Sequence, residues 1–190
     1  MLHAFLVSFG VIFVAELGDK SQLMALAFAA RYKPLPVVVA ITIATAIVHL
    51  ASVAIGAVVG AALPTRPINA IAAAAFVVFG LWTLRGDELT AEDEARASKT
   101  MRNVIVSVGT VFFLAELGDK TMLATVTLAT REGVIGTWLG STAGMVVADA
   151  LAIVVGRALG ARLPERAIRI GASAAFFVFA VLLGVEAIRG

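Results

Sequence analysis

Hydrophobic positions along the chain form long runs that are interrupted by short polar breaks. A helix that crosses a bilayer needs about 17–25 mostly apolar residues, and six runs meet that length. These runs are Leu2–Ala30, Pro36–Leu63, Ile68–Leu84, Val104–Thr130, Val134–Val155 and Ile168–Ile188. The pattern predicts an all-α polytopic membrane protein with six transmembrane helices and the lipid bilayer as its surroundings.

The composition agrees with this prediction. Of the 190 residues, 61% are hydrophobic and 15% are charged, whereas soluble domains have about 45–50% apolar and about 25% charged residues. The formal net charge is only +2 and no basic run occurs, which argues against nucleic-acid binding. The chain contains no cysteine, which excludes disulfides and thiolate metal sites.

The second half of the chain repeats the first half with a shift of 100 residues. The stretch AELGDKS at Ala15–Ser21 returns as AELGDKT at Ala115–Thr121, and similar matches continue through the third run. We therefore expect a first three-helix repeat at residues 1–84, an acidic linker at 85–103 and a second three-helix repeat at 104–190.

An odd number of spans in each repeat places the second copy upside down in the membrane. Such inverted repeats are typical of secondary transporters. Lys and Arg concentrate in the connections after the first, third and fifth runs, so the positive-inside rule predicts a cytoplasmic linker and both termini outside. Within the linker, Thr90 and Asp93 have the spacing of a capping box, which predicts a short surface helix from about Ala91 to Lys99.

The duplicated motif places charges near the middle of the bilayer. Glu16 lies about 21 Å from the start of the first run and Glu116 about 18 Å from the start of the fourth, at 1.5 Å per residue, in a hydrocarbon core about 30 Å thick. A charge at that depth costs roughly 2.5–3.5 kcal/mol. The charged side chains must therefore face one another or a watery cavity. Gly18 is expected to break the motif helix, as in the broken helices of transporters.

The acidic residues of the two motifs are the candidate metal ligands. They are Glu16, Asp19, Glu116 and Asp119. Glu16 and Asp19 leave the same helix face at i, i+3, and the hydroxyls of Ser21 and Thr121 follow as supporting groups. Carboxylate and hydroxyl oxygens without sulfur suit Ca²⁺, Mg²⁺ or Mn²⁺.

The lysines of the motifs determine the charge balance of this site. Lys20 follows Glu16 at i, i+4, the favoured order for an ion pair within a helix, and Lys120 repeats the arrangement. Two lysines against four carboxylates leave a formal excess of two negative charges. One divalent cation or two protons would balance it, which suggests cation/proton exchange.

His49 and Asp149 occupy equivalent positions in the second and fifth runs. A polar side chain between membrane helices often serves only to hold the helices together. Two titratable groups at one repeat position equally suggest a proton relay.

The two motifs resemble the signature of uncharacterised protein family 0016, within the lysine-exporter superfamily. The signature Glu-x-Gly-Asp-[Lys/Arg]-[Ser/Thr] reads ELGDKS at Glu16–Ser21 and ELGDKT at Glu116–Thr121. The resemblance implies Mn²⁺ transport, with Ca²⁺ as a second substrate in some members, commonly coupled to protons. It also implies that the motif acids hold the ion. The compact six-helix form is similar to bacterial members that export manganese across the inner membrane.

The expected function is therefore a transporter and not an enzyme, with Mn²⁺ or Ca²⁺ as cargo and no cofactor. A Ca²⁺/H⁺ antiporter of the same fold is an alternative. Alternatives from other classes are an intramembrane aspartyl protease that uses Asp19 and Asp119 as a dyad, and a non-transporting assembly subunit. The sequence leaves the ion selectivity, the coupling ion and the oligomeric state open.

Overall fold

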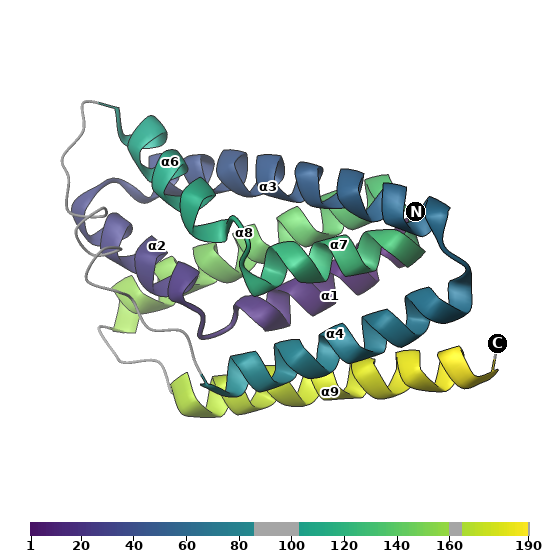
Figure 1. Ribbon diagram of the computed structural model, residues 1–190. Helices are drawn as coiled ribbons and strands as arrows, with labels where there is room; N and C mark the ends of the chain where they lie inside the picture. The colour runs from purple at the N-terminus through teal and green to yellow at the C-terminus, as the bar shows by residue number, and fades with distance from the viewer. Residues whose placement is uncertain (86–102, 160–164, 190) are drawn as a thin grey trace.

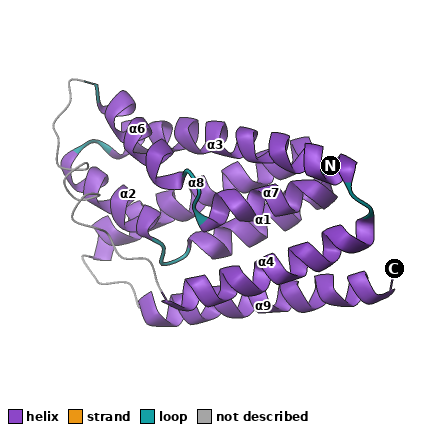
Figure 2. Cartoon of the chain, viewed as in Figure 1, coloured by secondary structure: helices purple, strands orange, loops and turns teal. Residues whose placement is uncertain are grey.

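The computed structural model describes residues 1–85, 103–159 and 165–189. The described chain is entirely helical, without a strand (Figures 1 and 2). Its helices are α1 (Leu2–Glu16), α2 (Lys20–Arg31), α3 (Pro34–Ala62), α4 (Thr65–Arg85), α6 (Val104–Glu116), α7 (Lys120–Glu132), α8 (Val134–Leu159) and α9 (Glu165–Arg189). Most of the predicted linker, with its proposed short helix at Ala91–Lys99, lies outside the described residues.

Each predicted hydrophobic run forms helix, but the first and fourth runs are divided. The first run consists of α1 and α2, which are bent by 73° and together are apolar enough to cross a membrane. Four unbroken helices in the described residues also have the length and composition of spans: α3, α4, α8 and α9. The fourth run is divided into α6 and α7, and α6 is a shorter apolar helix. Length and composition therefore support four or five spans.

The outward-facing surface of the bundle is apolar, and several charged residues are buried. Large aliphatic side chains such as Leu6, Ile47 and Val178 are exposed, whereas Glu16 and Asp119 are buried. A water-soluble protein seldom exposes so much contiguous apolar surface, and in a bilayer this surface faces lipid. The chain is therefore a polytopic helical membrane protein.

The helices of the first half pack mainly against helices of the second half. Helix α1 contacts α8, α3 contacts α6 and α7, and α4 contacts α9. The α4–α9 pair lies side by side along one edge of the bundle (Figure 1). Phe76 and Phe176, which are equivalent in the two halves, meet there with ring centroids 5.8 Å apart.

Small residues allow these helices to approach closely. A Cβ at Gly140 of α8 would lie 2.3 Å from the carbonyl oxygen of Phe5 in α1, and a Cβ at Gly56 of α3 would lie 2.4 Å from that of Val126 in α7. Close approach through glycine increases van der Waals packing between helices, which stabilises membrane bundles. These contacts hold the divided helices against α3 and α8.

Candidate cation site

Both motifs form breaks between helices. Helix α1 ends at Glu16 and α2 begins at Lys20, while α6 ends at Glu116 and α7 begins at Lys120. Gly18 and Gly118 have φ values of +76° and +80°, a conformation in which glycine avoids the steric penalty of a side chain. The predicted helix break is thus present in both motifs.

A short turn closes each break and places the acidic residues at helix ends. The backbone N–H of Asp19 donates to the carbonyl oxygen of Glu16 at 3.1 Å, and that of Asp119 donates to Glu116 at 3.2 Å. Asp19 and Asp119 are the N-cap residues of α2 and α7, but neither carboxylate makes a capping hydrogen bond. Both carboxylates therefore remain available for contacts with other elements.

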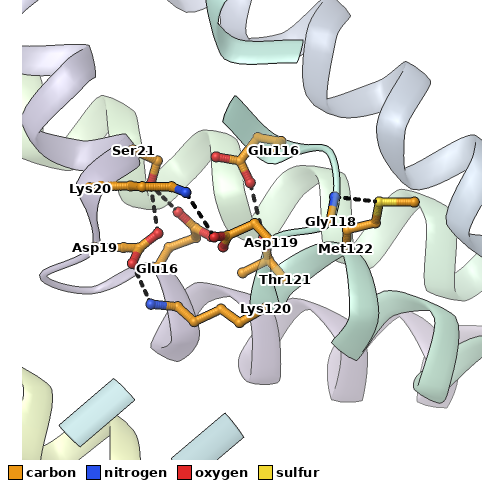
Figure 3. A network of polar contacts seen from close by, with 10 residues as sticks. All are labelled: Glu16, Asp19, Lys20, Ser21, Glu116, Gly118, Asp119, Lys120, Thr121 and Met122. Atoms are coloured by element: carbon orange, nitrogen blue, oxygen red, sulfur yellow. Dashed lines mark hydrogen bonds and ion pairs between the residues drawn. The ribbon is translucent and has the colours of Figure 1, made fainter. Parts of the chain in front are cut away.

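Each aspartate pairs with the lysine of the opposite motif (Figure 3). Lys20 Nζ lies 3.0 Å from Asp119 Oδ1, and Lys120 Nζ donates to Asp19 Oδ1. The side chain of Lys20 is 22% exposed, whereas that of Lys120 is 3% exposed. The expected ion pair between Glu16 and Lys20 is wrong, because the helix is broken between these residues and Lys20 reaches across to the other half.

The glutamates accept hydrogen bonds from the hydroxyls that follow them in sequence. Ser21 Oγ donates to Glu16 Oε2, and Thr121 Oγ1 donates to Glu116 Oε2 at 3.1 Å. Ser21 Oγ also lies 3.5 Å from Asp19 Oδ2. The two motifs thus place their glutamates and hydroxyls in corresponding contacts.

Several carboxylate oxygens of this network are buried without a donor. Glu16 Oε1, Glu116 Oε1 and Asp119 Oδ2 accept no hydrogen bond from any residue that the structure describes. A buried anionic oxygen without a donor is destabilising. The chemistry of these oxygens therefore suits a hard divalent cation or protons.

The network is not yet a metal-coordination sphere. In the described ranges, no three acidic or histidine side chains converge closely enough to hold a metal ion together. Glu116 nevertheless interacts electrostatically with Glu16, Asp19 and Asp119. The structure therefore brings the four predicted acids within range of one another, with lysine ammonium groups paired to the aspartates.

The predicted relay residues are buried on α3 and α8. His49 is 1% exposed, with Nδ1 3.5 Å from Thr142 Oγ1 of α8. Asp149 is also 1% exposed and interacts electrostatically with Glu16 and Asp19. Asp149 therefore belongs to the surroundings of the first motif.

One polar residue at the site, Gln22, was not identified from the sequence. Gln22 accepts from the backbone N–H of Gly18 at 2.8 Å and donates to the carbonyl oxygen of Ala148 at 3.0 Å. At the equivalent position, Met122 Sδ accepts from the backbone N–H of Gly118 at 3.2 Å. The signal that could have identified Gln22 is a primary amide directly after a charged motif in an apolar helix.

A polytopic bundle with two charged helix breaks at its centre is typical of secondary transporters. The family model described as "Divalent cation/proton antiporter GDT1" matches residues 4–91 and 104–190. The chain belongs to this family, and the family resemblance predicted from the motifs is confirmed.

Similar proteins occur in bacteria and plants. A Vibrio cholerae protein named "Putative manganese exporter" is 32% identical over 92% of this chain and 87% of its own length. A GDT1-like protein of Synechocystis is 30% identical over 96% of this chain and 97% of its own. The chloroplastic protein PAM71 of Arabidopsis thaliana is 34% identical over 96% of this chain but 56% of its own. No solved structure matches.

Proposed function

We propose that this protein exports Mn²⁺ across the membrane in exchange for protons, with the ion held near the midplane by Glu16, Asp19, Glu116 and Asp119. The observation that carries the proposal is the pair of reciprocal lysine–aspartate contacts at the two helix breaks, beside carboxylate oxygens that lack donors. The family description and the name of the Vibrio cholerae relative support a divalent cation and manganese, respectively.

The lysines act in this scheme as tethered counter-charges. When the cation enters, the ammonium groups of Lys20 and Lys120 withdraw from the aspartates, and carboxylate oxygens take the ion. The hydroxyls of Ser21 and Thr121 each donate to one oxygen of a glutamate. The other oxygen of each glutamate accepts no hydrogen bond from the described residues. Protons that reach the carboxylates, with His49 and Asp149 as a relay, release the ion on the other side.

We further propose six spans arranged as two inverted repeats, at residues 1–84 and 104–190, with the linker at 85–103 on the cytoplasmic side and both termini outside. The contacts between the halves support this arrangement. Helix α1 of the first half contacts α8 of the second, and their repeat counterparts, α6 and α3, contact each other in the same way. A two-fold relation between the halves requires such paired contacts. The bacterial relatives that cover most of this chain support the inner membrane of a bacterium as the location.

Transport by the purified protein in proteoliposomes tests the proposal. We expect Mn²⁺ flux that depends on a pH gradient, with Ca²⁺ and Mg²⁺ as comparison ions. Glu16→Gln and Asp119→Asn should abolish the flux, because each removes a site carboxylate. Glu186→Gln is the matched control, since this carboxylate lies near the end of α9 with its side chain 55% exposed.

The outcomes separate the candidate functions. Equal Mn²⁺ flux by the parent and both site variants would refute the site assignment. Flux of Ca²⁺ in preference to Mn²⁺ would favour the Ca²⁺/H⁺ antiporter. Peptide cleavage without ion flux would favour the aspartyl protease, although each aspartate here pairs with a lysine, whereas a protease dyad shares one proton between its aspartates.

A further inference from the structure

Asp149 is a buried carboxylate outside the two motifs. It is 1% exposed, and neither Oδ1 nor Oδ2 accepts a hydrogen bond within the described part of the chain. Most buried side-chain polar atoms have a partner, and a buried charge without one is strongly destabilising. A carboxylate that only held helices together would accept a hydrogen bond from a neighbouring helix.

The location of Asp149 connects it to the first motif. Helix α8 packs against both α1 and α2, the two helices that flank the first break. Asp149 interacts electrostatically with Glu16 and Asp19, and also with Glu116. It therefore adds a fifth carboxylate to the buried acidic network.

Gln22 connects the first break to the turn of α8 that carries Asp149. Its side-chain oxygen accepts from Gly18 N at 2.8 Å, and its side-chain nitrogen donates to Ala148 O at 3.0 Å. Gln22 is 3% exposed. A single buried amide thus holds the backbone next to Asp149 at a fixed position relative to the motif.

The second motif lacks both features. Its residue equivalent to Gln22 is Met122, which only accepts a hydrogen bond from Gly118 N. The residue equivalent to Asp149 is His49, which lies against Thr142. The two motifs are therefore chemically unequal, and the additional carboxylate directly follows the α8 residue to which Gln22 of the first motif donates.

We propose that Asp149 is a fifth acidic group of the cation site, that it acts with Glu16 and Asp19, and that Gln22 is its positioning residue. This inference rests on the proposed function, since it presupposes a divalent cation at the motifs. It assigns to the first motif the stronger attraction for the ion, because Asp149 would add a third negative charge to those of Glu16 and Asp19.

Equilibrium Mn²⁺ binding to the full-length protein in detergent, measured by titration calorimetry, tests this inference without requiring transport. Removing a group that orients or supports metal ligands typically weakens metal affinity by roughly 10–100-fold, and we expect a loss in that range for Asp149→Asn. Asp149→Glu, which keeps the carboxylate, should recover part of the affinity. Gln22→Met, which installs the residue of the second motif, should weaken binding several-fold, and Glu186→Gln should not change it.

Unchanged Mn²⁺ affinity in folded Asp149→Asn would overturn the inference. If this variant also lost the dependence of Mn²⁺ flux on the pH gradient in proteoliposomes, Asp149 would be a proton relay only. Glu16→Gln, measured in parallel, distinguishes this failure from failure of the proposed function. If Glu16→Gln loses binding while Asp149→Asn keeps it, only the role of Asp149 is wrong. If Glu16→Gln binds Mn²⁺ like the parent, the motif site itself is wrong. Should Asp149→Asn not fold, parent-like affinity in both Asp149→Glu and Gln22→Met would overturn the inference.

Discussion

Replacing Lys120 by Gln should destabilise the protein more than replacing Lys20 by Gln. Lys120 and its partner Asp19 have side chains that are 3% and 0% exposed, whereas Lys20 is 22% exposed beside Asp119 at 1%. Removing one member of a fully buried ion pair costs about 3–5 kcal/mol, because the other charge stays buried without its counter-charge. Removing the partly exposed Lys20 should cost about 1–3 kcal/mol, because the remaining acceptor lies beside a solvent-accessible position.

Thermal unfolding of the purified protein in detergent measures this difference. For a chain of this size, each 1 kcal/mol corresponds to about 2–4 °C in Tm, so Lys120→Gln should lower Tm by about 6–20 °C. The double variant Asp19→Asn/Lys120→Gln should be more stable than Lys120→Gln alone, since it also removes the buried negative charge that Lys120 balanced. Lys33→Gln, at an exposed position before α3, is the control and should change stability by no more than about 0.5 kcal/mol.

Adding Mn²⁺ to the same samples tests the role of the lysine as a counter-charge. A ligand at 100 times its Kd stabilises the folded state by about 2.7 kcal/mol. Mn²⁺ should stabilise Lys120→Gln more than the parent, because the ion no longer has to displace an ammonium group from Asp19. Equal losses of stability in the two single lysine variants, or a smaller effect of Mn²⁺ on Lys120→Gln than on the parent, would refute the reasoning.

Three further predictions concern the breaks, the packing and the topology. Gly118→Ala should cost about 1–2 kcal/mol of stability in thermal unfolding, because its φ of +80° disfavours a side chain. Gly10→Ala is the control and should not lower stability, because a Cβ at Gly10 would lie in open space. Gly140→Ala should also lower Tm relative to Gly10→Ala, because its Cβ would lie 2.3 Å from a backbone oxygen of α1. The chain has no native cysteine, so single variants Lys33→Cys and Arg189→Cys can be labelled in intact cells with a membrane-impermeant maleimide, and only Arg189→Cys should react.

The sequence predicted the helices well because the relevant signals are local. The second hydrophobic run was expected at Pro36–Leu63 and is helical over Pro34–Ala62. The third was expected at Ile68–Leu84 and is helical over Thr65–Arg85. The break at each motif was also predictable, since a glycine between charges in an apolar run disfavours a continuous helix.

The partners of the charged side chains could not be predicted in the same way. The i, i+4 rule for Glu16 and Lys20 assumes a continuous helix, and the break removes that assumption. Once the helix ends at Glu16, the direction of Lys20 depends on how the two halves pack, and it meets Asp119 from a segment about 100 residues away. The two contacts of Gln22 likewise depend on the position of α8 relative to α2. Neither the Lys20–Asp119 pair nor the contacts of Gln22 can be predicted from the spacing of residues along the chain.

The differences between the repeats carry more functional meaning than their identity. The charged residues that the two motifs share explain why the charges can be buried, since each motif supplies the lysine that the other motif's aspartate needs. A transporter with identical halves, however, would hold its ion equally from both sides and would have no built-in direction. In this chain the halves differ next to the proposed ion site, because Gln22 corresponds to Met122 and His49 corresponds to Asp149. The unequal surroundings of two nearly identical motifs therefore provide a physical basis for attracting a cation more strongly to the first motif than to the second.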